Sequence, residues 1–282
     1  MHVQGSPEWL EMRKNYLGGS DAPAVMGVSP YRSRYQLWEE KVGLGKPQEV
    51  HAGMERGLHL EAEARAKLET LTGNLFAPEV KFHPKISYMM ASLDGIDPEG
   101  KAICEIKCPN RDDHAMALMG RIPDKYYPQI QHQLEVCGVE VCFYFSYREG
   151  EGHVIEVPRN EQYIKTLLSQ EEEFWERNVL TFEAPELEER DFVIIDHPQW
   201  HALSREMLDI HTRKKELEAE EKRIKDEIVR ISNNQNCKGH GLRVSHFVRK
   251  GPLDYSYLPE EVKAELEKHR KPPIKSVRVS LT

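Results

Sequence analysis

The segment from Ser92 to Lys107 constrains the fold of this 282-residue chain more than any other part of it. Two runs of strand-forming residues stand on either side of the turn sequence Asp97-Pro98-Glu99-Gly100. A strand, a tight turn and a second strand in this order predict a β-hairpin. The hairpin therefore fixes one pair of neighbouring strands within a larger sheet.

The second strand of this hairpin carries charged residues on one face. Because side chains alternate along a strand, Glu105 and Lys107 are expected on one face. The other face is expected to hold Cys104, Ile106 and Cys108. Asp94 ends the first strand, so we expect it to lie beside Glu105 and Lys107.

Two carboxylates that converge on one point repel each other unless a cation neutralises them. Oxygen ligands of this kind suit Mg²⁺ or Mn²⁺. A metal ion held by Asp94 and Glu105 would polarise a phosphodiester oxygen and activate a water, and Lys107 would orient that water or stabilise the developing charge. Taken alone, a Glu-x-Lys triplet is also explained by an exposed pair of surface charges.

A predicted helix from Met54 to Leu71 adds a third acid, Glu61. It shares a helical stripe with three apolar residues, namely Ala64, Leu68 and Leu71. This spacing turns Glu61 towards the interior, where a carboxylate needs a partner. That partner is either a metal ion or an arginine of the same helix, Arg56 or Arg65.

The first 160 residues alternate between helical and strand patterns with Gly and Pro between them, which predicts one compact α/β domain. Helices are expected over Ser6–Tyr16, Ser33–Val42, Met54–Leu71, Asp112–Met119 and Lys125–Cys137. Strands are expected over Phe76–Phe82, Tyr88–Leu93, Ala102–Lys107, Val141–Arg148 and His153–Val157.

A different organisation is expected towards the C-terminus. An amphipathic helix at Glu161–Asn178 is followed by an acidic, Pro-containing stretch at Thr181–Arg190, where we place the domain boundary. Apolar residues then fall on the a and d positions of four heptads, interrupted by Lys214 and Glu221. They are Leu203, Met207, Ile210, Leu217, Ile224, Ile228 and Ile231. This spacing predicts a coiled-coil hairpin arm or an intersubunit helix.

The last segment, residues 233–282, is predicted to be rich in β-structure, with strands at Leu242–Val248 and Ile274–Leu281. It is basic, although the whole chain has a net charge of −8. A local basic surface is sufficient for DNA contact, so the net charge does not exclude a nucleic-acid partner. A structural cap or a docking surface is the interpretation we favour for this segment, and DNA contact is the alternative.

Cysteine content and hydropathy restrict the class of protein. The five cysteines form an odd set without a CxxC pair, which predicts reduced and mostly buried thiols rather than disulfides, a zinc site or an iron–sulfur cluster. No run of 18 apolar residues and no signal-peptide pattern is present in the sequence. We therefore expect a cytoplasmic protein without membrane partners.

Six short motifs occur in the order found in one family of nucleases. They are Ser6-Pro7-Glu8-Trp9 with Arg13, Gly18-Gly19-Ser20-Asp21, Arg56-Gly57 with Glu61, Ser92-Leu93-Asp94-Gly95, Glu105-Ile106-Lys107-Cys108-Pro109, and Tyr127-Pro128-Gln129-Ile130-Gln131. Over about residues 1–180 the chain thereby resembles the phage lambda exonuclease and YqaJ-type viral recombinase nucleases of the PD-(D/E)XK superfamily. Leu93 stands where the superfamily signature has proline.

The resemblance implies a restriction-endonuclease-like core, in which a central mixed β-sheet is flanked by helices. It implies that Glu61, Asp94 and Glu105 surround two Mg²⁺ ions, for which Mn²⁺ can substitute. The carbonyl of Ile106 would add a ligand, and Lys107 would be the catalytic lysine.

The resemblance also implies where DNA binds. Arg13 and Ser20 match the family's site for the terminal 5′-phosphate, and Ser92 is placed with them as a DNA-binding residue. The family has an active-site glutamine on the helix that begins near Tyr127. We choose Gln131, because with Tyr127 and Glu135 it flanks the apolar stripe of that helix.

The implied activity is degradation of one strand of linear duplex DNA in the 5′-to-3′ direction. It would expose 3′ single-stranded tails for a single-strand annealing recombinase, with the nuclease assembled as a homo-oligomer, a trimeric ring in the family. The setting would be the cytoplasm of a bacterial host that carries the phage or prophage. A structure-specific or nicking endonuclease on the same fold and a non-catalytic DNA-binding or assembly protein are the alternatives.

The expected domain organisation has four parts. They are an exonuclease domain at 1–180, a linker at 181–200, a coiled-coil segment at 201–232 and a small basic β-rich element at 233–282. The region from about Arg190 onward has no counterpart in the compact members of the family, so the trimeric ring need not carry over to this chain.

Overall fold

The computed structural model describes residues 7–45, 52–246 and 258–267. The chain forms two compact units, Met1–Val193 and Ile194–Thr282. The helices of the first unit are α1 (Pro7–Arg13), α2 (Ala22–Val25), α3 (Arg34–Lys41), α4 (Ala52–Thr72), α5 (Arg111–Leu118), α6 (Tyr127–Cys137) and α7 (Glu161–Glu173), with a π-helical turn η1 (Phe174–Val179) and a 3₁₀ turn η2 (Glu189–Asp191). Its strands are β1 (Leu17–Gly18), β2 (Ala77–Phe82), β3 (Met89–Ile96), β4 (Ala102–Lys107), β5 (Val141–Arg148) and β6 (Glu151–Pro158).

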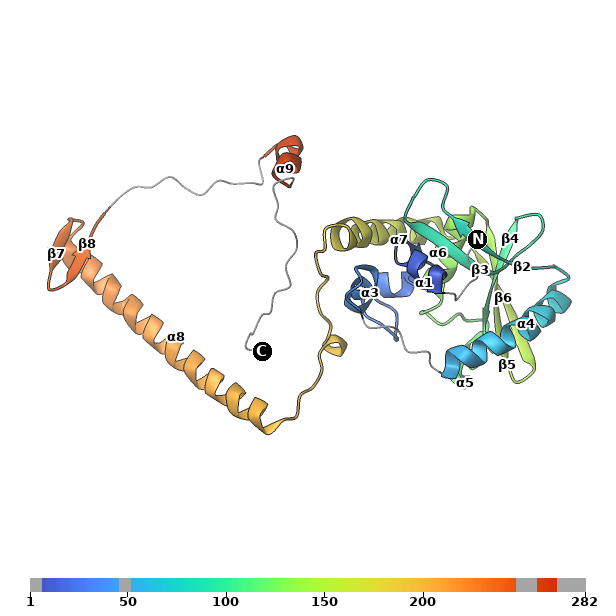
Figure 1. Cartoon of the computed structure of the whole chain (residues 1–282), viewed down its shortest axis with the longest axis horizontal. Helices are drawn as coiled ribbons and strands as arrows, with labels where there is room; N and C mark the ends of the chain where they lie inside the picture. The colour runs from blue at the N-terminus through green and yellow to red at the C-terminus, as the bar shows by residue number, and fades with distance from the viewer. Residues whose placement is uncertain (1–6, 46–51, 247–257, 268–282) are drawn as a thin grey trace. The chain divides into compact units, whose positions relative to one another are not determined.

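The first unit is built on a mixed six-stranded sheet with helices on both faces (Figure 1). The strand order is β1-β3-β4-β5-β6, and β2 also pairs with β3. β1 with β3 and β4 with β5 are parallel, whereas β2 with β3, β3 with β4 and β5 with β6 are antiparallel. The expected α/β core with a central mixed sheet flanked by helices is confirmed.

Helix α6 covers one face of the sheet. Its residues Ile130 and Leu134 are fully buried against a layer of strand residues that includes Leu93, Ile103 and Tyr144. Burying a large apolar side chain contributes roughly 1.5–3 kcal/mol, so this layer is a principal source of stability. Helix α6 ends at Gly138, whose φ of 65° is the left-handed conformation that favours glycine.

Helix α4 covers the opposite face. Ala64 and Leu68 of α4 pack with Cys104 and Ile106 of β4 and with Phe145 of β5. The predicted alternation along β4 is therefore confirmed, because Cys104 and Ile106 lie on the α4 face. Leu71 was expected in the same buried stripe of α4, but it is 51% exposed because it lies in the last turn of the helix.

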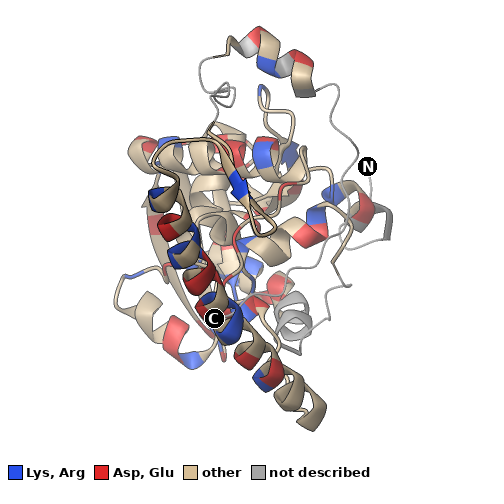
Figure 2. Ribbon diagram, turned by 90° about the vertical axis from the view of Figure 1, so that its left-hand side faces the viewer, with Lys and Arg blue, Asp and Glu red and all other residues tan. Residues whose placement is uncertain are grey.

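The second unit contains one long helix, α8 (Pro198–Ser232), a two-stranded hairpin of β7 (Cys237–Gly239) and β8 (Leu242–Val244), and helix α9 (Glu260–Glu267). α8 is continuous rather than a helical hairpin, and residues of both charge signs lie along it (Figure 2). Its apolar heptad residues include Leu203, Leu217 and Ile231, all more than half exposed. The coiled coil stays a prediction.

The C-terminal strands, the cysteines and the absence of a membrane-spanning helix were also predicted from the sequence. The predicted strand Leu242–Val248 is shorter, and Ile274–Leu281 lies outside the described residues. Cys104 and Cys142 are buried free thiols and Cys108 and Cys137 are half-buried, whereas Cys237 is exposed. Among the described residues, no helix is both long enough and apolar enough to span a membrane.

Candidate active site

Strands β3 and β4 separate at Asp94. Towards Asp94 and Glu105, the last paired residues of the two strands are Gly95 and Cys104. Beyond that point the amide of Ile106 donates a hydrogen bond of 2.7 Å to Oδ2 of Asp94. The Asp94 side chain thus takes the place of a backbone partner, which satisfies a buried amide and holds the carboxylate against β4.

Gly95 is required by the packing next to Asp94. A Cβ atom at this position would lie 2.6 Å from Cβ of Phe76 and 2.8 Å from Sγ of Cys104. Both separations are well below ordinary van der Waals contact, so a larger residue would push β3 away from its neighbours. The glycine of the Asp-Gly pair therefore lets the strands approach where Asp94 has to be held.

Glu105 is 1% exposed and is held by three donors. Gln129 donates from Nε2 to Oε1 of Glu105 over 2.7 Å, and Gln133 donates from Nε2 to Oε2 over 2.6 Å. Lys107 Nζ lies 2.5 Å from Oε1. Gln129 and Gln133 are four residues apart on α6, so both face the strand from one side of the helix. Both carboxylate oxygens have a partner, which fixes the orientation of Glu105.

Asp94 and Glu105 are two buried carboxylates that repel each other. Burial and the neighbouring Glu105 raise the pKa of Asp94 to about 8, although Lys107 and the Ile106 amide act in the opposite direction. Burial lowers the pKa of Lys107, but Glu105 and Asp94 outweigh this effect and raise it above its ordinary value. One ammonium group therefore does not balance two buried carboxylates.

The donor chemistry of this cluster fits a hard divalent cation, since Asp94 and Glu105 offer carboxylate oxygens. In the described part of the chain, no group of three or more His, Cys, Asp or Glu side chains is arranged to hold a metal ion, and this includes Glu61, Asp94 and Glu105. Glu61 instead pairs with Arg65 at 2.5 Å, the ion-pair alternative for this residue. Arg65 Nε also donates to the carbonyl of Asp94 over 3.0 Å, so Glu61 is tied to the cluster through an arginine.

The structure does not bring Gln131 to this cluster. Its amide group donates to the carbonyl of Pro158 over 3.0 Å, and its carbonyl accepts from the amide of Asn160 over 2.9 Å. Gln131 therefore joins α6 to the β6–α7 connection, and its choice as the active-site glutamine is corrected. Its neighbours Gln129 and Gln133 contact Glu105 instead, because they lie on the side of the helix that faces β4.

Ser92 lies two residues before Asp94 on β3, and so on the same face of that strand. Its hydroxyl oxygen is buried and has no hydrogen-bond partner within the described residues. An unsatisfied buried hydroxyl costs free energy, so a hydrogen-bonding partner for Ser92 would stabilise the protein.

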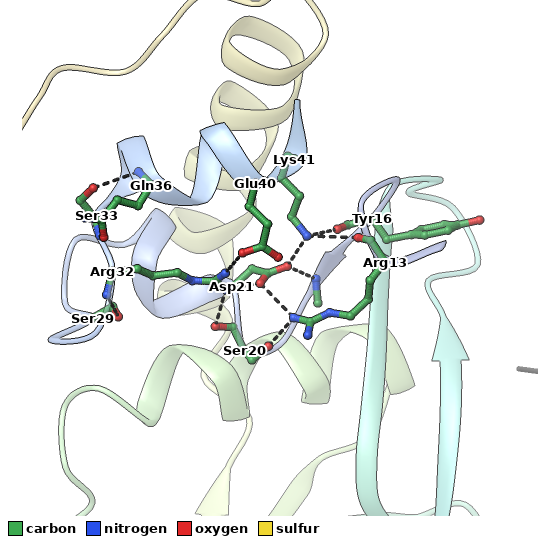
Figure 3. Close-up of polar contacts among 11 residues, drawn as sticks. Arg13, Tyr16, Ser20, Asp21, Ser29, Arg32, Ser33, Gln36, Glu40 and Lys41 are labelled. Carbon is green, nitrogen blue, oxygen red and sulfur yellow. Dashed lines mark hydrogen bonds and ion pairs between the residues drawn. The ribbon is translucent and has the colours of Figure 1, made fainter. Parts of the chain in front are cut away.

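Arg13 and Ser20, which the family resemblance placed together, are in contact (Figure 3). Nη2 of Arg13 donates to Oγ of Ser20 over 2.6 Å and to Oδ1 of Asp21 over 3.0 Å. The Arg13 side chain remains 21% exposed, whereas that of Asp21 is fully buried. An arginine with an accessible edge beside a hydroxyl is suited to bind a phosphate group.

Asp21 contacts the cationic side chains of this cluster. Its role was not predicted from the sequence. It accepts hydrogen bonds from the Gly18 amide and from Arg13, Arg32 and Lys41. Burial favours the neutral acid, but Lys41, Arg13 and Arg32 hold the pKa of Asp21 well below its ordinary value. Its position directly after Ser20 in the Gly-Gly-Ser-Asp motif was the available signal.

The turn at Gly19, directly before Ser20, lies beside helix α6. A Cβ atom on Gly19 would lie 3.1 Å from Cγ of Gln133 and 3.3 Å from Cγ of Gln129. The turn before Ser20 therefore packs on the two glutamines that hold Glu105. The Arg13–Ser20 pair and the carboxylate cluster are thus built against the same helix.

Comparison with known proteins finds similarity to one protein family and to a bacterial exonuclease of known structure. Residues 8–140 match the family model described as YqaJ-like viral recombinase domain. The uncharacterized protein YqaJ of Bacillus subtilis (strain 168) is 29% identical over 187 residues, which are 64% of this chain and 59% of that protein. The chain therefore matches less than two thirds of the length of this curated relative.

Two solved structures of one bacterial enzyme share the fold. The alkaline exonuclease LHK-Exo from Laribacter hongkongensis has a TM-score of 0.54 and 27% identity, covering 61% of this chain and 91% of the other. The structure of LHK-Exo in complex with dAMP gives a TM-score of 0.54 and 26% identity, with the same coverage.

Proposed function

Since this chain carries a YqaJ-like viral recombinase domain over residues 8–140, we propose that it is a nuclease that degrades one strand of linear duplex DNA from the 5′ end. The observation that carries the proposal is the orientation of Glu105 by Lys107 and two glutamines, next to Asp94. Similarity to an alkaline exonuclease, one structure of which holds the deoxynucleotide dAMP, supports a DNA substrate. The product would be a duplex with a 3′ single-stranded tail.

The proposed cofactor is Mg²⁺, with Mn²⁺ as a substitute and two ions as in the family resemblance. Asp94 and Glu105 would hold it, together with the carbonyl of Ile106 and with Glu61 after release from Arg65. When bound, such an ion polarises the phosphodiester and makes a bound water more acidic. The raised pKa of Asp94, caused by burial and by Glu105, supports the need for an added positive charge.

The protein's own groups have distinct proposed roles. Lys107 remains charged beside Glu105 and stabilises negative charge that develops on the phosphate during cleavage. Gln129 and Gln133 are positioning residues, because they touch Glu105 and fix both of its oxygens. Arg65 keeps α4 and the end of β3 in register through the carbonyl of Asp94.

The requirement for a DNA end would arise from Arg13 and Ser20. The guanidinium and the hydroxyl are 2.6 Å apart and offer donors to the terminal 5′-phosphate. Asp21 holds Arg13 from the buried side, so the accessible edge stays available for the ligand. Because Gly19 packs on Gln129 and Gln133, a terminal phosphate bound at Ser20 would place the next linkages towards Glu105.

The proposed biological partner is a single-strand annealing protein that takes up the 3′ tail, and the proposed assembly is a homo-oligomer. The family description as a viral recombinase domain supports the first of these. The second unit, with its long exposed helix α8, is the proposed region for contact with other chains.

Digestion of a linear duplex, compared with a covalently closed circle of the same sequence, tests the proposed function. Linear DNA with 5′-phosphate or 5′-hydroxyl ends is incubated with the full chain in Mg²⁺ and in chelator. Degradation of the 5′-phosphorylated linear strand alone, stopped by chelator, is the expected result. Cutting of the circle would instead indicate an endonuclease, and absence of cutting would indicate a binding protein.

A further inference from the structure

Tyr31 is an exposed aromatic residue close to the candidate active site. Its side chain is 72% exposed. Nζ of Lys125 lies 5.3 Å from the centre of the Tyr31 ring and 5.2 Å from that of Tyr126. Lys107 Nζ lies 5.3 Å from the Tyr126 ring. Tyr31 and Lys125 therefore continue the surface that begins at Lys107.

The loop that carries Tyr31 is held firmly on both sides. Oγ of Ser29 accepts hydrogen bonds from the amides of Tyr31 and Arg32, over 3.2 and 3.3 Å. The Arg32 side chain reaches Asp21 and Glu40, as Figure 3 shows. An exposed ring on an anchored loop loses little conformational freedom when a ligand stacks on it.

Two ammonium groups lie near the Tyr31 and Tyr126 rings, and each is also paired with a carboxylate, Lys125 with Asp113 and Lys107 with Glu105. Lys125 is paired with Asp113 at 2.6 Å, which fixes its ammonium beside the Tyr31 ring. Lys107 adds a second cation, 5.3 Å from the centre of the Tyr126 ring. An aromatic ring among cations is the arrangement that binds single-stranded nucleic acid, where bases stack and phosphates meet positive charge.

We propose that Tyr31 stacks on the base of an unpaired nucleotide of the strand that is being degraded, with Lys125 beside the phosphate of that nucleotide. This inference rests on the proposed nuclease function and adds a binding site to it. Stacking accepts every base, since each has an aromatic face, and an enzyme that degrades any sequence needs such tolerance. Tyr31 would hold the strand while Lys107 and Glu105 act on a neighbouring linkage.

The test uses the full chain and a duplex whose 5′-phosphorylated strand ends in a short unpaired segment containing 2-aminopurine. Stacking of this base on a tyrosine quenches its fluorescence, and titration in chelator separates binding from turnover. Tyr31→Ala is expected to abolish the protein-induced quench and to weaken binding roughly 5- to 100-fold, the range that base–aromatic stacking gives. Tyr31→Phe keeps the ring and is expected to retain the quench.

Phe182→Ala is the matched control, because Phe182 is also an exposed aromatic residue, at 49%. It is expected to leave both readings unchanged. If Tyr31→Ala leaves the fluorescence quench and the affinity at their wild-type values, the proposal is overturned. It is also overturned if the substitution changes only the sedimentation coefficient, because Tyr31 would then contact another copy of the chain. If the wild type cleaves linear DNA in these cases, the proposed function stands and only this inference fails.

Discussion

Nζ of Lys107 lies 2.5 Å from Oε1 of Glu105, two residues earlier on the same strand. The Glu105 side chain is 1% exposed and that of Lys107 is 25% exposed, so the pair presents its ammonium edge towards solvent. Because the two side chains share one face of β4, the strand itself sets their separation. This pair is the part of the candidate active site that a substrate phosphate would meet.

Lys107→Met should lower the rate of DNA cleavage by about 10²–10³, the loss seen when one group that stabilises developing charge is removed. Lys101→Met is the matched control, because Lys101 lies in the same hairpin but its side chain is 77% exposed and pairs with Glu99. Initial rates on 5′-phosphorylated duplex measure the effect, with circular dichroism as a check of folding. Equal rates for the two variants would remove Lys107 from the active site.

Gln133→Ala should lower activity by roughly 10- to 100-fold, as is usual when a group that orients a metal-binding carboxylate is lost. Gln131→Ala should behave differently, because Gln131 contacts Pro158 and Asn160 and not Glu105. We expect it to destabilise the fold by about 1–3 kcal/mol and to spare the rate of the folded enzyme. Thermal unfolding and cleavage assays on both variants separate the roles, and the reverse result would restore Gln131 as the active-site glutamine.

Arg13→Ala should reduce the preference for 5′-phosphorylated over 5′-hydroxyl ends by roughly 10- to 100-fold, since hydrogen bonds to a charged group contribute about 1.5–3 kcal/mol. The ratio of initial rates on the two ends is the measurement. Lys14→Ala, which removes the neighbouring charge that pairs with Glu11, should leave this ratio unchanged. An Arg13→Ala enzyme with the wild-type ratio would show that Arg13 does not bind the terminal phosphate.

Asp21→Asn should destabilise the protein by about 3–5 kcal/mol at pH 7, because it leaves Arg13, Arg32 and Lys41 without their buried anion. The folded-state pKa of Asp21 is depressed, so its stabilisation is complete above the ordinary value of 3.8 and is lost as the pH falls through the lower folded value. The difference in unfolding free energy between wild type and variant should therefore shrink below about pH 4. Denaturant titrations at several pH values test this, and a difference that stays constant would contradict the ion-pair cluster.

Truncation after Val193 should preserve both folding and cleavage of short linear duplexes, because the first compact unit ends there. Truncation after Glu188 should cost about 1–3 kcal/mol of stability. It removes the Arg190 hydrogen bond to the carbonyl of Ser29 and the Asp191 bond to the hydroxyl of Ser33. A folded but inactive protein ending at Val193 would assign a catalytic role to the second unit.

The strands around the site were predictable because their signal is local. β4 and β5 have the predicted bounds, Ala102–Lys107 and Val141–Arg148, and period-two alternation places Glu105 and Lys107 together. β1 is two residues long, so it has no period that a pattern can detect. The helix α9, over Glu260–Glu267, lies in a segment that was expected to be rich in β-structure.

The site residues that were missed depend on tertiary packing. The sequence indicates that α6 is amphipathic, but it does not indicate which polar residue faces β4, and so Gln131 was chosen over Gln129 and Gln133. Asp21 is fully buried and paired with three cations, Arg13, Arg32 and Lys41, and the last two lie outside all six motifs. Such a cluster forms only when the chain folds, whereas the Arg13–Ser20 pair follows from motifs that occur in order.

The most direct test of Glu105 as the centre of a metal-dependent nuclease site is the rate at which Glu105→Gln releases nucleotides from 5′-phosphorylated linear duplex in Mg²⁺. Glutamine keeps the size of the side chain but removes the charge that a metal ion needs. We expect release to fall to the level seen for the wild type in chelator, while thermal unfolding remains cooperative. Cleavage by Glu105→Gln at the wild-type rate in Mg²⁺ would contradict the assignment of this cluster as the active site.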